Sequence, residues 1–331
     1  MKEILILFGG NSNEHSVSIK SAESIAKHID QNLFKVSYIY ISKDNLWYKF
    51  HDDFAQLSNK QWCQNHEDDI IFNVIKYLQY FDVVFPILHG KNGEDGRLQG
   101  MLELFQIPYV GCSAVASGIA MNKSYTKMLA TQINIPTLPF VVIDKDDYMV
   151  EEVSNVLDFP VIVKPMTEGS SIGIEVVNTI SDLDQAIKKA GVYAKQLLVE
   201  PFIQGKELEC AILYNNGAIT GAVGEIKTID HFYDYETKYQ NDNAELIIPA
   251  TISEDHTTKI QTYSKQLFKL LGNQGFARID FFLEKESQQI YLNEINTIPG
   301  FTSISMFPKL FEYSGLDYQN LITTLIENAI D

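Results

Sequence analysis

The sequence predicts an α/β protein whose first third forms a parallel sheet with helices on its faces. The chain has 331 residues, which is enough for two or three domains with cores of their own. Short apolar runs that suit buried strands alternate with segments of helical periodicity, and this alternation is typical of parallel sheets. Hydrophobic residues make up 45% and charged residues 21% of the chain, so we expect an ordinary globular protein.

The N-terminal third supplies the alternating elements. We predict strands over residues 4–8, 35–41 and 83–88 and helices over residues 16–29 and 96–104. Ligands of parallel sheets bind beyond the carboxyl ends of the strands. Residues 9–14 (GGNSNE) and 89–96 (HGKNGEDG) follow two such ends, so we expect binding residues in both segments.

A second unit is expected to begin around Ser113. We predict a helix over residues 121–132, strands over residues 140–143, 161–164 and 197–200, and a further helix before the last of these strands. Ser181 and Asp184 form a capping-box-like start for that further helix, and Gly191 is a suitable end.

The last third opens with a predicted strand over residues 207–214. Residues 227–245 are polar and aromatic without clear periodicity, so we expect a structured loop or lid there, or else a surface loop whose aromatic rings pack locally. The remaining predicted elements are a helix over residues 257–271 that ends at Gly272, two strands around Arg278 and Glu294, and a terminal helix from Tyr318.

The totals exclude several classes of protein. The net charge of −17 disfavours nucleic acid or an anionic membrane as the main partner. The three cysteines are far apart and form no CxxC pair, which suits a reducing cytoplasm and gives no zinc site. The apolar run near the N-terminus is too short for a signal-peptide core, and no apolar run reaches membrane-spanning length.

Polar residues occupy one face of each of the two strands predicted near residues 278–296. Side chains alternate along a strand, so Asp280 shares a face with Arg278, and Glu294 shares a face with Asn296. If the strands pair as a hairpin, Asp280, Glu294 and Asn296 converge as hard oxygen ligands beside a guanidinium. Mg²⁺ that also carries phosphate oxygens needs such a site. The alternative is a surface hairpin with scattered charges, which the apolar residues around the acids disfavour.

Residues 168–173 (EGSSIG) follow a predicted strand that ends at Lys164. Backbone N–H groups of such a loop can wrap phosphate oxygens, and Lys164 can add a point charge. The segment is not a Walker A loop because no Gly-Lys-Ser/Thr follows. Taken alone, the loop could be a plain turn and Lys123 a solvated lysine.

Glu14 stands where a dinucleotide-binding turn would have glycine. The GxGxxG pattern that begins at Gly9 is incomplete, and a carboxylate would repel a pyrophosphate but would suit an ammonium group. The alternative for Glu14 is a charge favoured at a helix N-terminus by the macrodipole. His89 has an alternative of its own, as a structural histidine with satisfied hydrogen bonds.

Seven motifs in order resemble the D-alanine–D-alanine ligase family of ATP-grasp enzymes. They are GGNSNEHSVS, FPILHGKNGEDGRLQG, VKPMTEGSSIG, VEPFIQGKE, FYDYETKY, ARIDFF and NEINTIPGFTSISMFP. The resemblance covers essentially the whole chain. It implies a Rossmann-like N-terminal domain (residues 1–113) followed by a two-part ATP-grasp fold, with a central domain (residues 114–206) and a C-terminal domain (residues 207–331) that hold ATP between them.

The resemblance also implies which residues bind nucleotide and metal. The implied nucleotide residues are Lys123, Lys164, Glu168, Ser170, Ser171, Glu200, Ile203, Glu207 and Lys238. Of these, Lys123 and Lys164 would contact the phosphates. Glu200 and Ile203 would meet the adenine, and Glu207 the ribose. Asp280, Glu294 and Asn296 match ligands of two Mg²⁺ (or Mn²⁺) ions, with Glu294 bridging them; potassium activates some relatives.

The implied substrate and catalytic residues lie in six of the seven motifs. Glu14 matches the carboxylate that receives the ammonium of the first D-alanine, and His89 lies beside that substrate. Glu14, Ser170 and Tyr239 match a hydrogen-bonded trio over the site. The other implied residues are Arg278 and Gly300, which match the oxyanion-stabilising pair, and Ser305 and Met306, which match the stretch that binds the second substrate's carboxylate.

The implied reaction is ATP-dependent ligation of two D-alanine molecules, through a D-alanyl phosphate, for peptidoglycan synthesis. Such an enzyme is expected in a bacterial cytoplasm, usually as a homodimer. Tyr239 and Met306 favour D-alanine over D-lactate or D-serine as the second substrate, because lactate makers lack the tyrosine and both groups typically have arginine at the Met306 position. The rival classes are another ATP-grasp ligase, which would lack Glu14 and FYDYETKY, and a nucleotide sensor, which would have lost Arg278 or a metal ligand.

Overall fold

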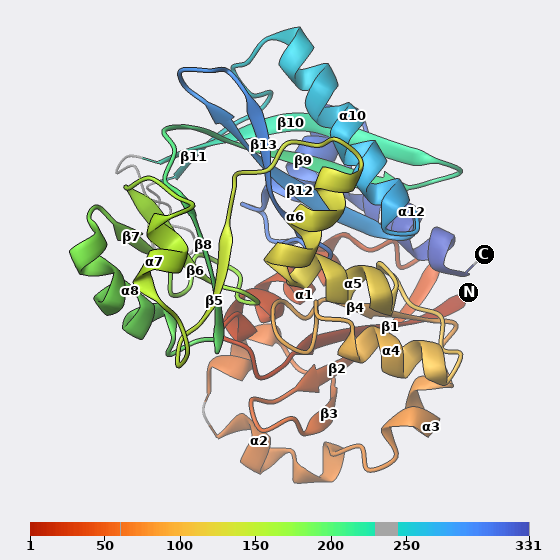
Figure 1. Cartoon of the computed structure of the whole chain (residues 1–331). Helices are drawn as coiled ribbons and strands as arrows, with labels where there is room; N and C mark the ends of the chain where they lie inside the picture. The colour runs from red at the N-terminus through yellow and green to blue at the C-terminus, as the bar shows by residue number, and fades with distance from the viewer. Residues whose placement is uncertain (60, 229–243, 331) are drawn as a thin grey trace.

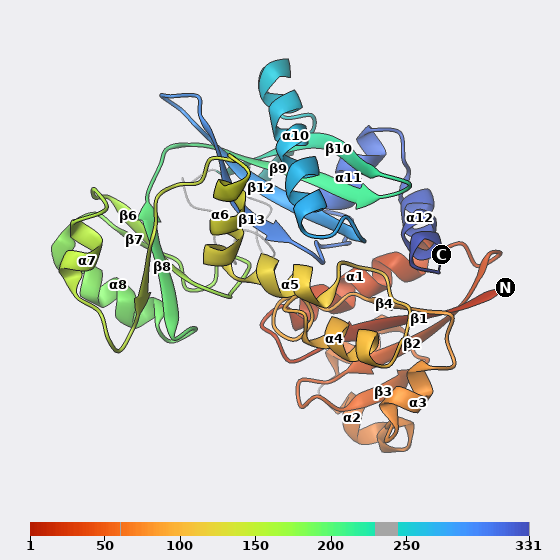
Figure 2. The same ribbon diagram turned by 45° about the vertical axis from the view of Figure 1, so that its right-hand side comes forward.

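The computed structural model describes residues 1–59, 61–228 and 244–330, in which the strands form three sheets (Figure 1). One sheet belongs to the first third of the chain, one to the middle and one to the last third. The middle sheet and its two helices form a lobe that stands apart from the rest, as Figure 2 shows most clearly.

The N-terminal sheet has the strand order β3-β2-β1-β4. Its strands are β1 (Lys2–Gly9), β2 (Phe34–Ile41), β3 (Trp47–Phe50) and β4 (Val83–Pro86). β1 pairs in parallel with β2 and β4, so the predicted parallel sheet is confirmed, and only the edge strand β3 is antiparallel to its neighbour. Residues 4–8 of β1 are fully buried, as expected for a central parallel strand covered on both faces.

Helices and short turns surround this sheet. They are α1 (His15–His28), η1 (Phe54–Ser58), α2 (Trp62–Asn65), η2 (Glu67–Asp69), α3 (Val74–Leu78) and α4 (Arg97–Leu104). The two long predicted helices correspond to α1 and α4. The elements between residues 54 and 78 were not predicted, because each is shorter than two helical turns and shows no helical periodicity.

The helix predicted over residues 121–132 is wrong at its start. The structure has two helices, α5 (Ala114–Met121) and α6 (Lys123–Gln132), which are separated by Asn122. The Asn122 side chain accepts hydrogen bonds from the backbone N–H groups of Ser124 and Tyr125 and so caps α6. Lys123 is therefore the first residue of a helix.

The middle sheet is antiparallel with the order β5-β8-β6-β7. Its strands are β5 (Val141–Asp144), β6 (Val161–Pro165), β7 (Glu175–Val177) and β8 (Gln196–Pro201), accompanied by α7 (Val150–Ser154), η3 (Ile180–Asp182) and α8 (Leu183–Ala190). The predicted capping box at Ser181 is wrong, because a 3₁₀ turn precedes α8 and the cap residue Asp182 makes no side-chain capping bond. Gly191 does follow the last helical residue.

The C-terminal sheet is antiparallel with the order β11-β10-β9-β12-β13. Its strands are β9 (Gly205–Tyr214), β10 (Ala218–Thr228), β11 (Ala244–Ile247), β12 (Phe276–Glu284) and β13 (Ile290–Asn296). Alternate side chains of β9 are buried in two different hydrophobic cores, one on each face of the sheet. Cys210 and Ile212 share a core with residues of α10 (Glu254–Leu270), whereas Ala211 shares a core with residues of α11 (Met306–Tyr313).

The first and last thirds of the chain share one hydrophobic core. Phe85 of β4 lies 6.4 Å from Phe276 of β12 between ring centroids, and Phe301 contacts both rings. The terminal helix α12 (Tyr318–Ile330) packs on α1 and β4, so the two chain ends lie close together (Figure 1). This shared core fixes the loops of the N-terminal sheet against the residues that follow β13.

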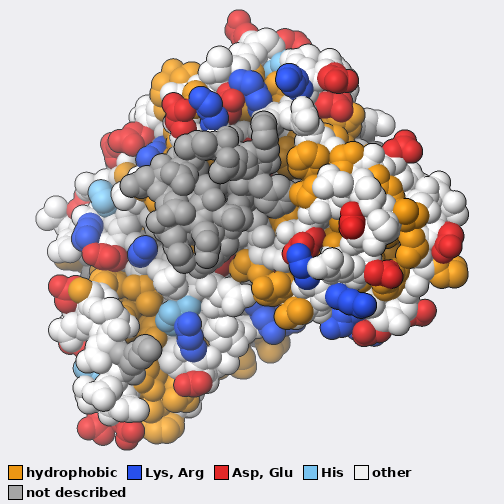
Figure 3. All heavy atoms as spheres, turned by 90° about the vertical axis from the view of Figure 1, so that its left-hand side faces the viewer, with side chains coloured by type: hydrophobic (Ala, Val, Ile, Leu, Met, Phe, Trp, Pro, Cys, Tyr) orange, Lys and Arg blue, Asp and Glu red, His pale blue; other side chains and the backbone are white. Residues whose placement is uncertain are grey.

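One face of the molecule carries charges of both signs. Figure 3 shows lysines and arginines interspersed with acidic residues around the described part of one face. Of the helices that the structure describes, none combines the length and apolar character that a membrane crossing requires.

Candidate active site

A cavity of about 900 Å³ lies between the middle sheet and the C-terminal sheet. This volume is within the range of small-molecule sites. Many of the residues singled out in the sequence line it, namely Lys123, Lys164, Glu168, Ser170, Ser171, Glu200, Ile203, Glu207, Asp280 and Glu294. Apolar side chains such as Ile162, Leu208 and Phe281 complete its walls, so the cavity offers both flat apolar surface and convergent charge.

The predicted hairpin is confirmed. β12 and β13 pair so that Asp280 lies opposite Glu294 and Arg278 lies opposite Asn296. The ladder shifts register directly after Asp280, and the Asn296 amide donates a hydrogen bond to the Asp280 carboxylate over 2.9 Å. The structure therefore brings the three predicted metal ligands together at one end of the hairpin.

Arg278 lies between two carboxylates in the protein interior. It donates two hydrogen bonds to Asp280, over 2.8 and 2.7 Å, and its Nε lies 3.0 Å from a carboxylate oxygen of Glu209. Burial alone would lower the pKa of Arg278, but Asp280 and Glu209 outweigh it and raise the pKa well above the usual value. The guanidinium is thus a permanent and rigidly held positive charge. Glu209 was not singled out in the sequence, although it follows Glu207 by two residues and so shares its face of β9.

The chemistry of the hairpin residues fits a magnesium ion that also carries phosphate. Asp280 and Glu294 offer only oxygen atoms, and Mg²⁺ is typically held by one or two carboxylates together with substrate phosphates. Lys123 Nζ lies 3.3 Å from Glu294 Oε2, so a positive charge is already present beside these acids. Across the described residues, no group of three or more His, Cys, Asp or Glu side chains has metal-binding geometry.

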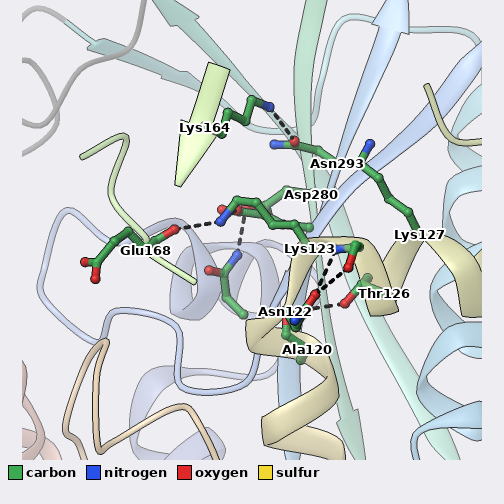
Figure 4. Close-up of polar contacts among 12 residues, drawn as sticks. Ala120, Asn122, Lys123, Thr126, Lys127, Lys164, Glu168, Asp280 and Asn293 are labelled. Carbon is green, nitrogen blue, oxygen red and sulfur yellow. Dashed lines mark hydrogen bonds and ion pairs between the residues drawn. The ribbon is translucent and has the colours of Figure 1, made fainter. Parts of the chain in front are cut away.

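The glycine-containing loop at residues 168–173 is hydrogen-bonded to Lys123, which lies beside Glu294 (Figure 4). Lys123 Nζ donates a hydrogen bond to the Glu168 carbonyl over 2.6 Å. Ser170 and Ser171 adopt the left-handed backbone conformation, with φ of 51° and 58°. Backbone N–H groups of such a tight turn can face a shared hollow that suits an anion.

Glu14 lies where three segments meet. It is buried, it is the N-cap residue of α1, and it accepts a hydrogen bond from the Ser170 hydroxyl. Gly90 packs beside Glu14 with a φ of 72°, a left-handed backbone conformation that favours glycine there. Burial and the Glu14 charge raise the pKa of Glu168, which indicates that negative charge concentrates around this point.

Both ring nitrogens of His89 have hydrogen-bond partners. Nδ1 lies 2.9 Å from the Ile298 carbonyl and Nε2 lies 3.0 Å from the Ser21 hydroxyl. His89 is 4% exposed. These contacts fix the ring and hold the segment that leads to Gly300, and the place of His89 beside the first substrate stays a prediction.

Glu94 is a partly buried acid that joins two segments far apart in the chain. Its carboxylate accepts hydrogen bonds from the backbone N–H groups of Gly90, over 2.7 Å, and Ile298, over 3.2 Å. The Ile298 peptide is thus held at its N–H by Glu94 and at its carbonyl by His89. Burial and the nearby Glu14 charge raise the pKa of Glu94 to about 8, despite these two donors.

We expect Glu94 to make stability fall with rising pH. Its pKa in the folded protein, about 8, is above the ordinary value of 4.5, so between these pH values the folded state keeps a proton that the unfolded state has lost. The contribution of Glu94 to the free energy of unfolding is therefore present at pH 4.5 and lost towards pH 8. The limiting slope of that free energy is about 1.4 kcal/mol per pH unit. In Glu94→Gln the melting temperature should rise relative to wild type as pH increases from 5 to 8. A pH-independent difference between the two melting temperatures would contradict this prediction.

The segment between β13 and α11 carries the remaining predicted residues. Ser305 Oγ accepts a hydrogen bond from the Thr302 N–H over 3.0 Å, and a Cβ on Gly300 would lie 2.6 Å from Ser305 Oγ. The Met306 side chain is buried in the core shared by the first and last thirds. Because Met306 is the first residue of α11, its backbone N–H is the group available to a ligand.

The Glu200 carboxylate is paired with two lysines. It forms ion pairs with Lys164 of β6 and with Lys127 of α6, the latter over 2.7 Å. Burial raises the pKa of Glu200, but the two lysines outweigh this and lower it to about 2. Lys127 was missed in the sequence, although it lies four residues after Lys123 and so shares its face of the helix.

Two predicted residues, Lys238 and Tyr239, lie outside the described residues, as does most of the predicted lid at residues 227–245.

Comparisons with known proteins give a consistent result over the whole chain. A family model described as D-ala D-ala ligase N-terminus matches residues 3–112, and one described as D-ala D-ala ligase C-terminus matches residues 129–327. A protein named D-alanine--D-alanine ligase from Caldicellulosiruptor bescii is 40% identical, over 99% of this chain and 95% of its own length. Another of that name from Acetivibrio thermocellus is 38% identical, over 99% and 96%.

Solved structures agree in fold. The VanG D-Ala:D-Ser ligase from Enterococcus faecalis matches with a TM-score of 0.88 and 34% identity, covering 99% of both chains. The D-alanine-D-alanine ligase from Coxiella burnetii matches with a TM-score of 0.86 and 34% identity, covering 100% of this chain and 94% of that one.

Proposed function

The chain belongs to the D-alanine–D-alanine ligase family, and we propose that it joins two D-alanine molecules through a D-alanyl phosphate, releasing ADP and phosphate. The predicted α/β fold, with a Rossmann-like N-terminal part followed by an ATP-grasp fold, is that of its structural relatives. The observation that carries the proposal is that Asp280 and Glu294 of the hairpin, Lys123 and the 168–173 loop line one cavity, with Glu14 hydrogen-bonded to that loop.

ATP is proposed to bind between residues 114–206 and 207–331. The adenine would lie against the apolar wall near Glu200 and Ile203, with Glu207 at the ribose. The phosphates would extend toward Lys123 and the 168–173 loop, where N–H groups and lysine charge can neutralise them. Lys164 and Lys238 complete the proposed nucleotide set.

The proposed metal ligands are Asp280, Glu294 and Asn296. When bound there, Mg²⁺ (or Mn²⁺) would neutralise charge on the transferring phosphoryl group. The carboxylates supply the charge that holds the ions, and the Asn296 hydrogen bond fixes the orientation of Asp280.

The first D-alanine is proposed to place its ammonium at Glu14, where the buried carboxylates favour a cation. Its carboxylate oxygen attacks the γ-phosphorus of ATP, a new oxygen–phosphorus bond forms, and ADP leaves. The carboxylate needs this activation because its own leaving group would be oxide. The tie between Glu14 and Ser170 keeps the loop over the phosphates and limits access of water to the acylphosphate.

The second D-alanine is proposed to attack the activated carbonyl carbon with its neutral amine. The carbonyl oxygen then carries the negative charge of a tetrahedral intermediate, which the Arg278 guanidinium and the Gly300 N–H stabilise. Phosphate leaves with the electron pair of the broken carbon–oxygen bond, and the new amide loses one proton. The carboxylate of the second substrate would bind at Ser305 and at the Met306 backbone N–H.

Product identification tests this function and its acceptor together. With ATP and Mg²⁺, we expect D-alanine to release phosphate and to give D-alanyl-D-alanine as the dominant product, even in mixtures with D-serine or D-lactate. The uncharged Met306 at the start of α11 and Tyr239 favour this acceptor. L-alanine is the control and should give no turnover.

A dominant D-Ala–D-Ser product would agree with the proposed mechanism but contradict D-alanine as the second substrate. Similarity to the VanG D-Ala:D-Ser ligase makes D-serine the second candidate. No turnover dependent on a D-amino acid would overturn the function. On the family resemblance we further propose that the enzyme acts as a homodimer in a bacterial cytoplasm and supplies the dipeptide for peptidoglycan.

A further inference from the structure

Glu200 is a single buried acid that faces two lysines from different elements. It is 1% exposed at the end of β8. Lys164 reaches it diagonally across the β6–β8 ladder, in which Ile162 is the residue directly opposite Glu200. Lys127 reaches it from α6. One carboxylate thus holds together the helix and the two strands that form one wall of the cavity.

The two lysines are not equivalent. Lys164 lines the cavity and has further neighbours, with Asn293 Oδ1 at 3.4 Å and the Phe282 ring centroid at 5.7 Å from its amine. Lys127 is 1% exposed and is absent from the described residues that line the cavity. Figure 4 shows Lys127 extending from α6 toward the side of the site where Lys164 and Asn293 lie. Ligands can therefore reach Lys164, whereas Lys127 faces Glu200 from within the protein.

The charges of these groups depend on one another. Burial lowers the pKa of Lys127, and the Glu200 carboxylate opposes that fall. A buried carboxylate left without a counter-ion is strongly unfavourable. If Lys164 turns toward a phosphate, Glu200 therefore needs another cation to remain ionised.

We propose that Lys127 is a positioning residue, the resident counter-ion of Glu200 that allows Lys164 to leave Glu200 and bind the phosphates of ATP. This inference rests on the proposed function for the location of ATP. It assigns Lys127 no contact with substrate, because Lys127 acts through Glu200 and Lys164. It also explains why one acid is paired with two lysines in the wall of a nucleotide site.

The test compares binding of ADP and of adenosine by titration calorimetry in the presence of Mg²⁺. Lys127→Met removes the resident cation, so Lys164 must stay with Glu200 and the phosphates lose its charge. The ratio of the adenosine Kd to the ADP Kd should fall by about tenfold, the typical effect of one hydrogen bond to a charged group. Lys195→Met is the matched control, because Lys195 is exposed and pairs with Asp144 outside the cavity; it should leave the ratio unchanged.

A double variant separates positioning from a structural role. In Lys127→Met/Glu200→Gln no buried carboxylate remains to retain Lys164, so the ratio should return to the wild-type value or exceed it, although adenosine itself binds more weakly. This variant removes the buried Lys127 and Glu200 charges together and leaves no buried carboxylate without a cation, so it also serves if Lys127→Met alone fails to fold.

Three results would overturn the inference. An equal change in both Kd values for Lys127→Met would show that Lys127 only supports the fold. A low ratio that persists in the double variant would show that Lys127 acts without Glu200. Wild-type protein that fails to bind ADP would overturn the nucleotide site itself, whereas ADP binding without dipeptide synthesis would contradict only the proposed reaction.

Discussion

Replacing Arg278 with alanine is expected to lower kcat by at least ~10²–10³-fold, the usual effect of losing one oxyanion donor. The guanidinium is held by Asp280 and Glu209, so in the proposed reaction it would already be in place when charge develops on the substrate oxygen. Arg278→Lys should also be impaired, because lysine cannot make the same forked contact with Asp280. The measurement is steady-state phosphate release with saturating ATP and D-alanine.

Loss of structure must be separated from loss of chemistry, because the alanine variant leaves two buried acids without their cation. ADP binding and the melting temperature of each variant provide that check. Arg97→Ala is the matched control, since Arg97 is an exposed arginine paired with Asp95 and should keep normal turnover. A folded Arg278→Ala protein that binds ADP and retains near-normal kcat would refute the assigned role.

Glu294→Gln is expected to lower kcat by roughly 10²-fold or more and to remove the benefit of Mg²⁺ for ADP binding. Glutamine keeps the shape of the side chain but loses the charge that would hold the ions, and metal neutralisation of a phosphoryl group contributes several kcal/mol to its transfer. The measurement is the Kd of ADP with and without Mg²⁺, beside kcat.

Glu286→Gln provides the control for that experiment, because Glu286 is exposed on the turn of the same hairpin. It should behave as wild type in both measurements. If Mg²⁺ strengthened ADP binding equally in Glu294→Gln and wild type, Glu294 would not be a metal ligand.

The hairpin could be predicted from the sequence because its information is local. Strand alternation alone places Asp280 beside Arg278 and Glu294 beside Asn296, and the polar segment between the strands predicts their pairing. The break at Asn122 was also encoded locally, in an amide that can cap the next turn. It was missed because the apolar pattern continues through Met121 and hides the cap.

The contacts of Glu94 and Lys127 could not be predicted in the same way. Glu94 binds a peptide N–H that is 204 positions away in the chain, and Lys127 pairs with an acid on a strand of the middle sheet. Such contacts depend on how the sheets pack, which no local pattern specifies. The burial of Met306 is a further case, because its neighbours come from a core that both ends of the chain build together.

That jointly built core has a consequence for synthesis of the protein. Phe85 leaves the ribosome about 190 positions before Phe276, which is roughly 10 to 40 seconds earlier at the usual rates of translation. During this time the core around Phe85 lacks the part that the last third supplies, because Phe276 and Phe301 have not yet been made. The N-terminal sheet therefore completes its core contacts only when translation is nearly finished.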